Sequence, residues 1–233
     1  MAEHLSIDSL VHYTLIKSII DTGKNPDISE IAQLLNVSLD DVKSSFKRLE
    51  ANHGIVLHPN SYNLWVIHPF SISPTATWIQ KDTHSHQGWW APCMWCALGV
   101  ASLVPGQLTI HSRIAGECED IDIVIENGEP VYNDIFIHFA IRPKDAWQNV
   151  HHHCSMVLPF KKTQDVDDWA LRHNLPKGEV ISLKQTAELA KHWYGQHDRK
   201  DWQKWSIEEA VGIFNKAGLR NDFWNLDIQK GNF

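Results

Sequence analysis

Two of the four cysteines lie three residues apart in a tryptophan-rich run and could supply reactive sulfur. In the stretch WWAPCMWC, residues 89–96, Pro92 stands where a helix could begin, because proline suits the first helical turn. The sulfurs of Cys93 and Cys96 would then share one face near the helix N-terminus. The helix dipole and unpaired N–H groups stabilise a thiolate there, and the thiolate attacks electrophiles and binds soft metals. The pair alone also fits a redox motif, half a zinc site or two core residues.

A further cysteine, Cys154, directly follows three histidines and precedes an apolar run at residues 157–160. On a regular strand alternate side chains point to opposite faces, so at most His151 and His153 would share a face. These histidines could give Cys154 a proton source and additional ligands. The alternative is a surface histidine run beside a buried cysteine. Cys118 lies on an acidic turn, and we expect it to be peripheral.

A winged-helix-like domain is predicted over residues 1–75. Apolar residues recur at helical spacing in three segments, residues 5–22, 28–36 and 39–52. Two short β-like runs, 55–58 and 62–67, follow like a hairpin or wing. The Pro-, Ser- and Thr-rich segment 68–77 is the expected boundary to a second domain.

The remaining residues, 76–233, predict a larger α+β domain. Its expected strands are residues 108–112, 120–126 and 135–141, and its expected helices are 92–104, 166–172, 182–194 and 206–216. Short strands with mostly local connections favour an antiparallel sheet. The fold class is therefore α+β, with a winged-helix-like module followed by a mainly antiparallel sheet and flanking helices.

The overall charge and composition exclude some classes of function. The 233 residues carry a formal net charge of −7, so the whole-protein field repels phosphate backbones. Residues 1–75 contain five basic and eight acidic side chains, and the third expected helix opens with Asp40 and Asp41, so we expect no DNA binding. No apolar stretch is long enough for a membrane span, and no export segment is visible. Four cysteines without a secretion signal fit the reducing cytosol, so we expect a cytoplasmic protein.

Taken together, these motifs resemble the organomercurial (alkylmercury) lyase family. The likeness covers most of the chain and is carried by three motifs, Trp95-Cys96-Ala97-Leu98, His153-Cys154-Ser155 and Asp168-Trp169-Ala170. The resemblance implies that Cys96 and Cys154 are the two cysteines that cleave a carbon–mercury bond. The family carries an aspartate three residues after the first cysteine, and this chain departs from the pattern with Gly99.

The implied activity is cleavage of a carbon–mercury or related carbon–metal bond by two thiolates, while an acid protonates the leaving carbon. With no carboxylate at position 99, the proton would come from a thiol of the pair or from another group, namely Cys93, His151, His153, or the Glu119 and Asp120 pair. We predict Cys96, Cys154, Cys93 and His153 as catalytic residues, the three cysteines also being metal ligands.

Two other functions stay open. A third sulfur from Cys93 would hold a metal ion more tightly and favour noncatalytic binding or sensing of soft metals such as Hg(II) or Cu(I), although Cys93 could also simply pack against Trp89 or Trp90. The other open function is a different reaction on the same scaffold. In each case Hg(II) or another soft metal is substrate, product or ligand, no other cofactor is required, and the expected partners are a small organometallic compound and cytosolic thiols.

Overall fold

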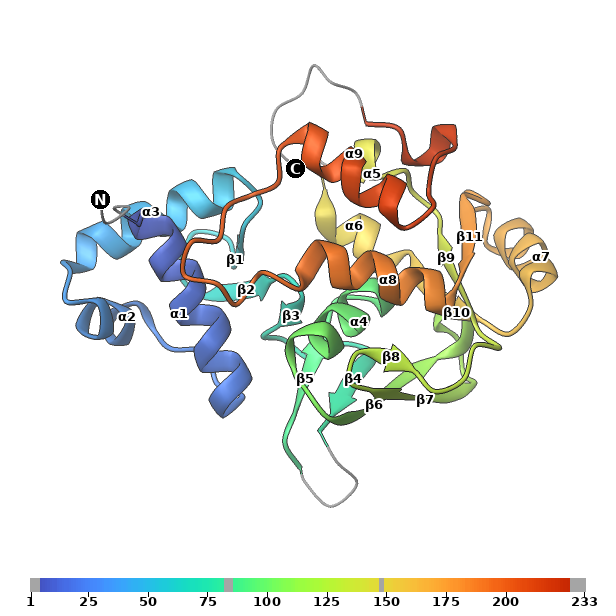
Figure 1. The fold of residues 1–233 in the computed structure, drawn as a ribbon, viewed down its shortest axis with the longest axis horizontal. Coiled ribbons are helices and arrows are strands. Elements are labelled where there is room, and N and C mark those ends of the chain that lie inside the picture. The colour runs from blue at the N-terminus through green and yellow to red at the C-terminus, as the bar shows by residue number, and fades with distance from the viewer. Residues whose placement is uncertain (1–4, 82–85, 147–148, 227–233) are drawn as a thin grey trace.

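Three helices form the N-terminal part of the molecule, at the left of Figure 1. The computed structural model describes residues 5–81, 86–146 and 149–226. Each of the three helices begins at a residue whose side-chain oxygen accepts a backbone N–H of the first turn, namely Ser6, Asp27 and Ser38. The helices are α1 (Ile7–Thr22), α2 (Ile28–Leu35) and α3 (Leu39–Ala51).

An eight-stranded sheet continues from this part through the centre of the molecule, in the order β1-β2-β3-β5-β4-β6-β7-β8. All of its strand pairs are antiparallel. The strands are β1 (Val56–Leu57), β2 (Leu64–Ile67), β3 (Phe70–Ser71), β4 (Thr77–Gln80), β5 (Gly88–Ala91), β6 (Gln107–Arg113), β7 (Asp120–Glu126) and β8 (Glu129–Pro130). The predicted wing therefore extends the same sheet as the later strands. The division into domains at residue 75 stays a prediction.

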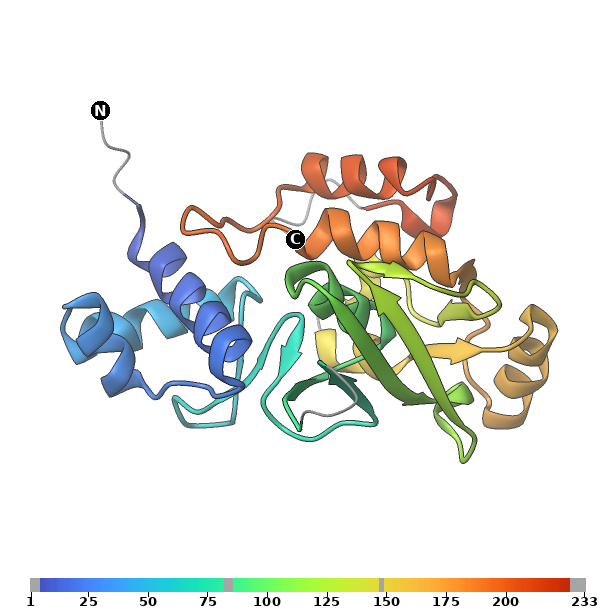
Figure 2. The same cartoon turned by 60° about the horizontal axis from the view of Figure 1, so that its bottom comes forward.

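A second, three-stranded antiparallel sheet lies beside the C-terminal helices, with β9 (Phe136–Phe139) between β10 (Val157–Phe160) and β11 (Glu179–Ser182). The helices of this half are α5 (Pro143–Ala146), α6 (Val150–Ser155), α7 (Thr163–His173), α8 (Leu183–Tyr194) and α9 (Ile207–Lys216), with 3-10 turns at Ile114–Gly116 and Asp222–Trp224. Figure 2 shows α8 and α9 stacked above the larger sheet.

Helix α4 (Met94–Leu103) lies at the centre of the core, between the large sheet and α8 (Figure 1). Every residue from Met94 to Ala101 is buried, as expected for a helix that is apolar on all sides. The N-terminal helices join the same core, and the indole of Trp89 in β5 donates a hydrogen bond to the carbonyl oxygen of Ile19 in α1 at 2.8 Å. A single hydrophobic core thus holds α4 in place from both halves of the chain.

The predicted α+β class with mainly antiparallel strands is confirmed. The strand geometry considered for residues 151–154 is wrong, because these residues belong to helix α6. Asn149 begins this helix, since its side chain accepts the backbone N–H of His152 at 3.0 Å. None of the helices in the described ranges combines the length and apolar character needed to cross a membrane.

Candidate functional site

Cys93 and Cys96 lie at the N-terminal end of α4. Cys93 is the N-cap residue, and its sulfur accepts the backbone N–H of Cys96 at 3.4 Å. The helix begins here because Pro92 and the extended backbone of Cys93 follow directly on strand β5. Both sulfurs therefore sit where the helix dipole favours negative charge, as the sequence predicted.

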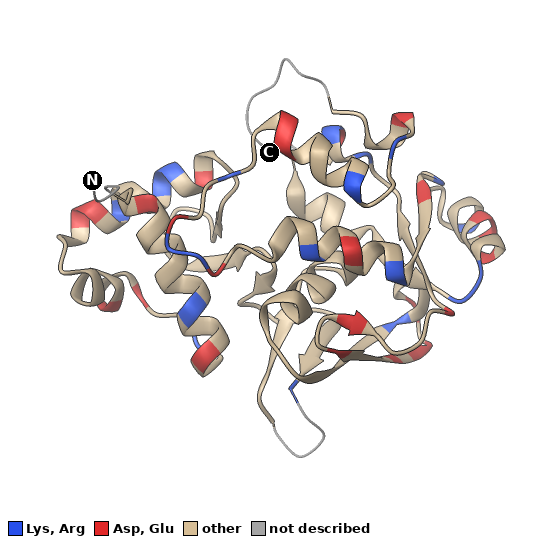
Figure 3. Cartoon of the chain, in the orientation of Figure 1, with Lys and Arg blue, Asp and Glu red and all other residues tan. Residues whose placement is uncertain are grey.

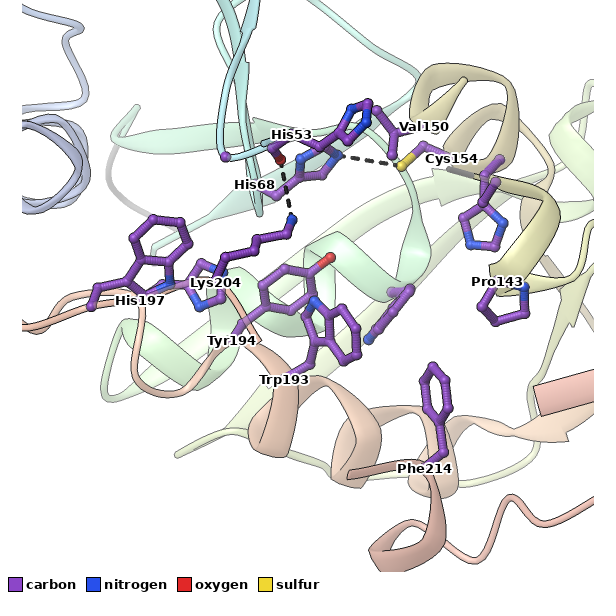
Figure 4. Close-up of a pocket in the computed structure, with 15 residues that line it drawn as sticks. His53, His68, Pro143, Val150, Cys154, Trp193, Tyr194, His197, Lys204 and Phe214 are labelled. Carbon is purple, nitrogen blue, oxygen red and sulfur yellow. Dashed lines mark hydrogen bonds between the residues drawn. The ribbon is translucent and has the colours of Figure 1, made fainter. Parts of the chain in front are cut away.

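Cys154, on helix α6, meets these sulfurs from the opposite side of the site. The Sγ atoms of Cys96 and Cys154 and a ring nitrogen of His68 all lie within 4.8 Å of one another. His68, in the turn between β2 and β3, has its Nε2 3.6 Å from Cys154 Sγ (Figure 4). Cys93 lies close enough to both of the other thiols to influence their ionisation. The three cysteines predicted from the sequence thus converge, although residues 96 and 154 are far apart in the chain.

Tyr194, the last residue of α8, approaches from a third direction. Its hydroxyl oxygen lies 3.5 Å from Cys96 Sγ, within hydrogen-bond reach of a sulfur. Its ring packs against the rings of Trp95 and His197, at centroid distances of 5.6 and 5.2 Å. The cysteine site is therefore formed by three helices, α4, α6 and α8, together with the β2–β3 turn.

Electrostatics differ among the three thiols. Burial, the largest influence, opposes ionisation of Cys93, but hydrogen bonds from Cys154 and Cys96 and from the Cys96 amide outweigh it and hold the pKa of Cys93 well below its ordinary value. Burial raises the pKa of Cys96, and hydrogen bonds to Cys93 and Cys96 raise that of Cys154. The three thiols therefore differ in how readily each one ionises.

The neighbouring imidazole and phenol are neutral. Burial lowers the pKa of His68 to about 3, and the nearby positive charge of Lys204 adds to this effect. Burial likewise raises the pKa of Tyr194 well above its ordinary value, and the negative thiolates raise it further. Near pH 7 His68 can accept a hydrogen bond from the Cys154 thiol, and Tyr194 keeps its proton.

A pocket opens onto Cys154. Its walls are mostly aromatic and aliphatic, which suits an organic group more than a free ion. The residues that line it are His53, Gly54, His68, Trp95, Pro143, Ala146, Val150, His153, Cys154, Trp193, Tyr194, His197, Trp202, Lys204 and Phe214. Figure 4 shows the hydroxyl of Tyr194 directed into this pocket, on the side where His68 and Cys154 lie.

Lys204 brings a positive charge to the pocket from the segment after α8. Its Nζ donates a hydrogen bond to the carbonyl oxygen of His53 at 3.2 Å (Figure 4), which links this segment to the end of α3. Burial lowers the pKa of Lys204 to about 8. The pocket is thus closed by parts of the chain that are about 150 residues apart.

The other residues named as proton sources are placed differently. His153 is buried, lines the pocket and lies edge-on to Trp95. His151 is stacked on Trp65 at 4.3 Å. Glu119 and Asp120 are exposed and form ion pairs with surface cations. Cys118 is exposed. Of these, the structure brings only His153 to the cavity wall.

Sequence reasoning missed His68 and Tyr194. His68 falls in the segment read as a linker, and Tyr194 ends a helix whose pattern predicted only packing. A histidine before a proline between two apolar runs, and a tyrosine at the end of an amphipathic helix, give no signal by themselves. Both reach the site through tertiary contacts with residues 86 and 98 positions away.

The N-terminal helices carry charges of both signs (Figure 3). Arg48 of α3 forms two hydrogen bonds with Asp8, at 2.9 and 2.7 Å, and Lys43 pairs with Asp40 at 3.4 Å. Cations that contact a carboxylate of their own chain are less able to contact phosphates. The absence of DNA binding stays a prediction.

Comparisons with known proteins bear on this site. A family model described as alkylmercury lyase matches residues 70–195, more than half of the chain. A solved structure, described as the mercury-bound form of MerB2, matches with a TM-score of 0.67 and 21% sequence identity, covering 85% of this chain and 94% of that one. A search of curated proteins finds no match.

Proposed function

The chain belongs to the alkylmercury lyase family, and we propose that it cleaves the carbon–mercury bond of small organomercury compounds. The observation that carries this proposal is the convergence of Cys96, Cys154 and His68 within 4.8 Å beside an aromatic pocket. Mercury is a soft metal that binds thiolates in low coordination numbers, so two converging sulfurs suit it. The aromatic walls would hold the organic group out of water.

The proposed reaction has two steps. In the first, the Cys96 sulfur displaces ligand X from R–Hg–X, so a mercury–sulfur bond forms, the mercury–X bond breaks, and the thiol proton leaves with X. In the second, the Cys154 sulfur bonds to mercury, the carbon–mercury bond breaks, and a proton joins the carbon to give R–H. Because Cys154 enters as a thiol, its proton balances the one that the hydrocarbon takes up. Hg(II) remains between two thiolates.

Supporting roles are proposed for the remaining groups. Cys93 lies near both reacting sulfurs and would offer mercury a third contact. His153 lies at the cavity wall, where its ring adjoins Trp95. Cytosolic thiols would then remove Hg(II) by exchange, as thiolate ligands exchange readily on a soft metal. This last step regenerates both cysteines as thiols.

Hydrocarbon release tests the proposal. Purified protein is incubated with methyl- or phenylmercury and excess small thiol, and methane or benzene is measured by gas chromatography. We expect release by the native chain and a loss of at least ~100-fold in Cys96→Ser and Cys154→Ser, since each removes a reacting group. Cys118→Ser is the matched control, because Cys118 is exposed. Release by the native chain no greater than by Cys96→Ser would contradict lyase activity.

A second candidate function is noncatalytic binding of a soft metal. It is favoured by the contact of Cys93 with both other sulfurs, because three thiolates hold Hg(II) or Cu(I) more tightly than two. In that case the native chain binds one metal ion per molecule, releases no hydrocarbon, and loses metal to a competing thiol faster after Cys93→Ser. The hydrocarbon assay and the metal-release assay together decide between the two functions.

A further inference from the structure

The ring of Tyr194 packs directly against Gly99 in the core. Gly99 lies in α4, one turn after Cys96, and faces the end of α8. A Cβ atom at position 99 would lie 2.3 Å from Cδ2 and 2.8 Å from Cγ of Tyr194, and 2.9 Å from Cβ of Pro69. All three distances are shorter than real Cβ contacts. The ring of Tyr194 therefore occupies the space that a side chain at position 99 would need.

The same ring brings a hydroxyl to the first sulfur. The Tyr194 oxygen lies 3.5 Å from Cys96 Sγ, and Figure 4 shows it directed into the pocket that contains Cys154. The phenol is held by packing on Trp95 and His197. A group bonded to mercury on Cys96 would therefore lie within reach of this oxygen.

Few groups at the cavity wall have a proton bound to oxygen. Among the described residues that line the cavity there is no Asp, Glu, Ser or Thr, and Tyr194 supplies the hydroxyl. Glu119 and Asp120, which the sequence offered as proton donors, are engaged in surface ion pairs. The ring of Tyr194 thus fills the space that a side chain at position 99 would need, and its hydroxyl supplies an O–H group at the cavity wall.

We propose that Tyr194 is a catalytic residue of this chain, whose hydroxyl delivers the proton to the carbon that leaves mercury. This inference rests on the proposed lyase function and names the acid that the function requires. In the step, the Tyr194 O–H bond and the carbon–mercury bond break while a carbon–hydrogen bond forms. The Cys154 sulfur bonds to mercury at the same time. The proton given up by the Cys154 thiol returns to the tyrosine oxygen, so the phenol is restored.

The variant Tyr194→Phe tests this role, because it removes the hydroxyl and keeps the ring that packs on Gly99. We expect hydrocarbon release in a single turnover to fall by at least ~100-fold, within the range usual for loss of a general acid. Binding of one Hg(II) per molecule should stay unchanged, since the three sulfurs and His68 remain. Tyr132→Phe is the matched control, because Tyr132 is 69% exposed and does not line the cavity.

A purely structural tyrosine would give a different pattern. Tyr194→Phe would then retain the native rate of release, or it would lower metal binding and release together, and either result overturns the proposal. Absence of release by the native chain would overturn the lyase function and this inference together. Hydrocarbon release at the same rate by the native chain and by Tyr194→Phe would overturn only the proposed role of Tyr194.

A double variant keeps the proposal testable if Tyr194→Phe does not fold. Tyr194→Ala should lose hydrocarbon release, and adding Gly99→Asp to it should restore part of that release, because the carboxyl then has the space left by the ring. Gly99→Asp/Tyr194→Ala no more active than Tyr194→Ala, with Hg(II) still bound one to one by both, would contradict the idea that the two residues serve the same purpose.

Discussion

The substitution Gly99→Ala should destabilise this protein, although glycine to alanine normally stabilises a helix. In an exposed helix interior the exchange gains about 1 kcal/mol from helix propensity. At position 99 the new methyl carbon would lie under 3.0 Å from atoms of Tyr194 and Pro69. Overpacking of a close-packed core costs about 1–3 kcal/mol, and with contacts this short we take the upper end. The expected net loss is therefore about 2 kcal/mol.

Urea unfolding followed by tryptophan fluorescence measures the free energy of unfolding, and thermal unfolding measures the melting temperature. For a chain of this size 1 kcal/mol corresponds to roughly 2–4 °C, so the melting temperature should fall by about 4–8 °C. Gly212→Ala is the matched control, since Gly212 lies within α9 and a Cβ there would meet nothing within 4 Å. That variant should gain stability by about 1 kcal/mol from propensity.

A double-mutant cycle with Tyr194 tests whether the tyrosine ring causes the loss of stability. In a Tyr194→Ala background the two closest contacts disappear and the contact with Pro69 remains, so the cost of Gly99→Ala should shrink to about zero. A coupling free energy of about 2 kcal/mol is therefore expected from the double-mutant cycle. Stabilisation of the native background by Gly99→Ala, as in the control, would refute the claim that the tyrosine ring fills this space.

Three further predictions concern pH, an exposed thiol and the junction of the two halves. Burial lowers the pKa values of His68 and His197 to about 3 each, so the neutral form of each histidine stabilises the fold fully above the unfolded pKa near 6.5 and less as the pH falls toward 3. The free energy of unfolding in urea should therefore be lower at pH 5 than at pH 7 by about 2 kcal/mol for each histidine. Equal stability at the two pH values would refute this. Cys118→Ser should leave the amount of Hg(II) bound per molecule unchanged in a titration with excess small thiol, which competes for isolated thiols, and a lost equivalent would place this thiol in the metal site. Trp89→Phe should lower the free energy of unfolding by about 1 kcal/mol through loss of the hydrogen bond to Ile19, and no change would show that this bond contributes nothing to the junction.

The sequence predicted the α+β class and most of the helices, because these depend on local patterns. Ser38, for example, caps its helix by contacts within one turn. Cys96 and Cys154 were instead chosen through the family resemblance, and their approach is a tertiary contact. The helical state of residues 151–154 was missed because a run of three histidines has no clear periodicity, and its cap, Asn149, lies outside the run. His68 and Tyr194 could not be identified, since their place at the site depends on how α4, α8 and the β2–β3 turn pack together.

On the proposed function, the balance between cleavage and retention of mercury would depend on charge in a buried site. Hg(II) bound by the thiolates of Cys96 and Cys154 is neutral overall, and a neutral group is tolerated at low dielectric constant. Adding the thiolate of Cys93 makes the complex anionic, and an isolated buried anion is costly unless a positive charge lies near. His68 is neutral near pH 7, because its pKa is about 3. Among the described residues of the pocket, Lys204 therefore supplies the positive charge that could compensate this anion. If the chain is a lyase, the two-sulfur complex would favour turnover, and the three-sulfur complex would favour retention to the extent that Lys204 stabilises it.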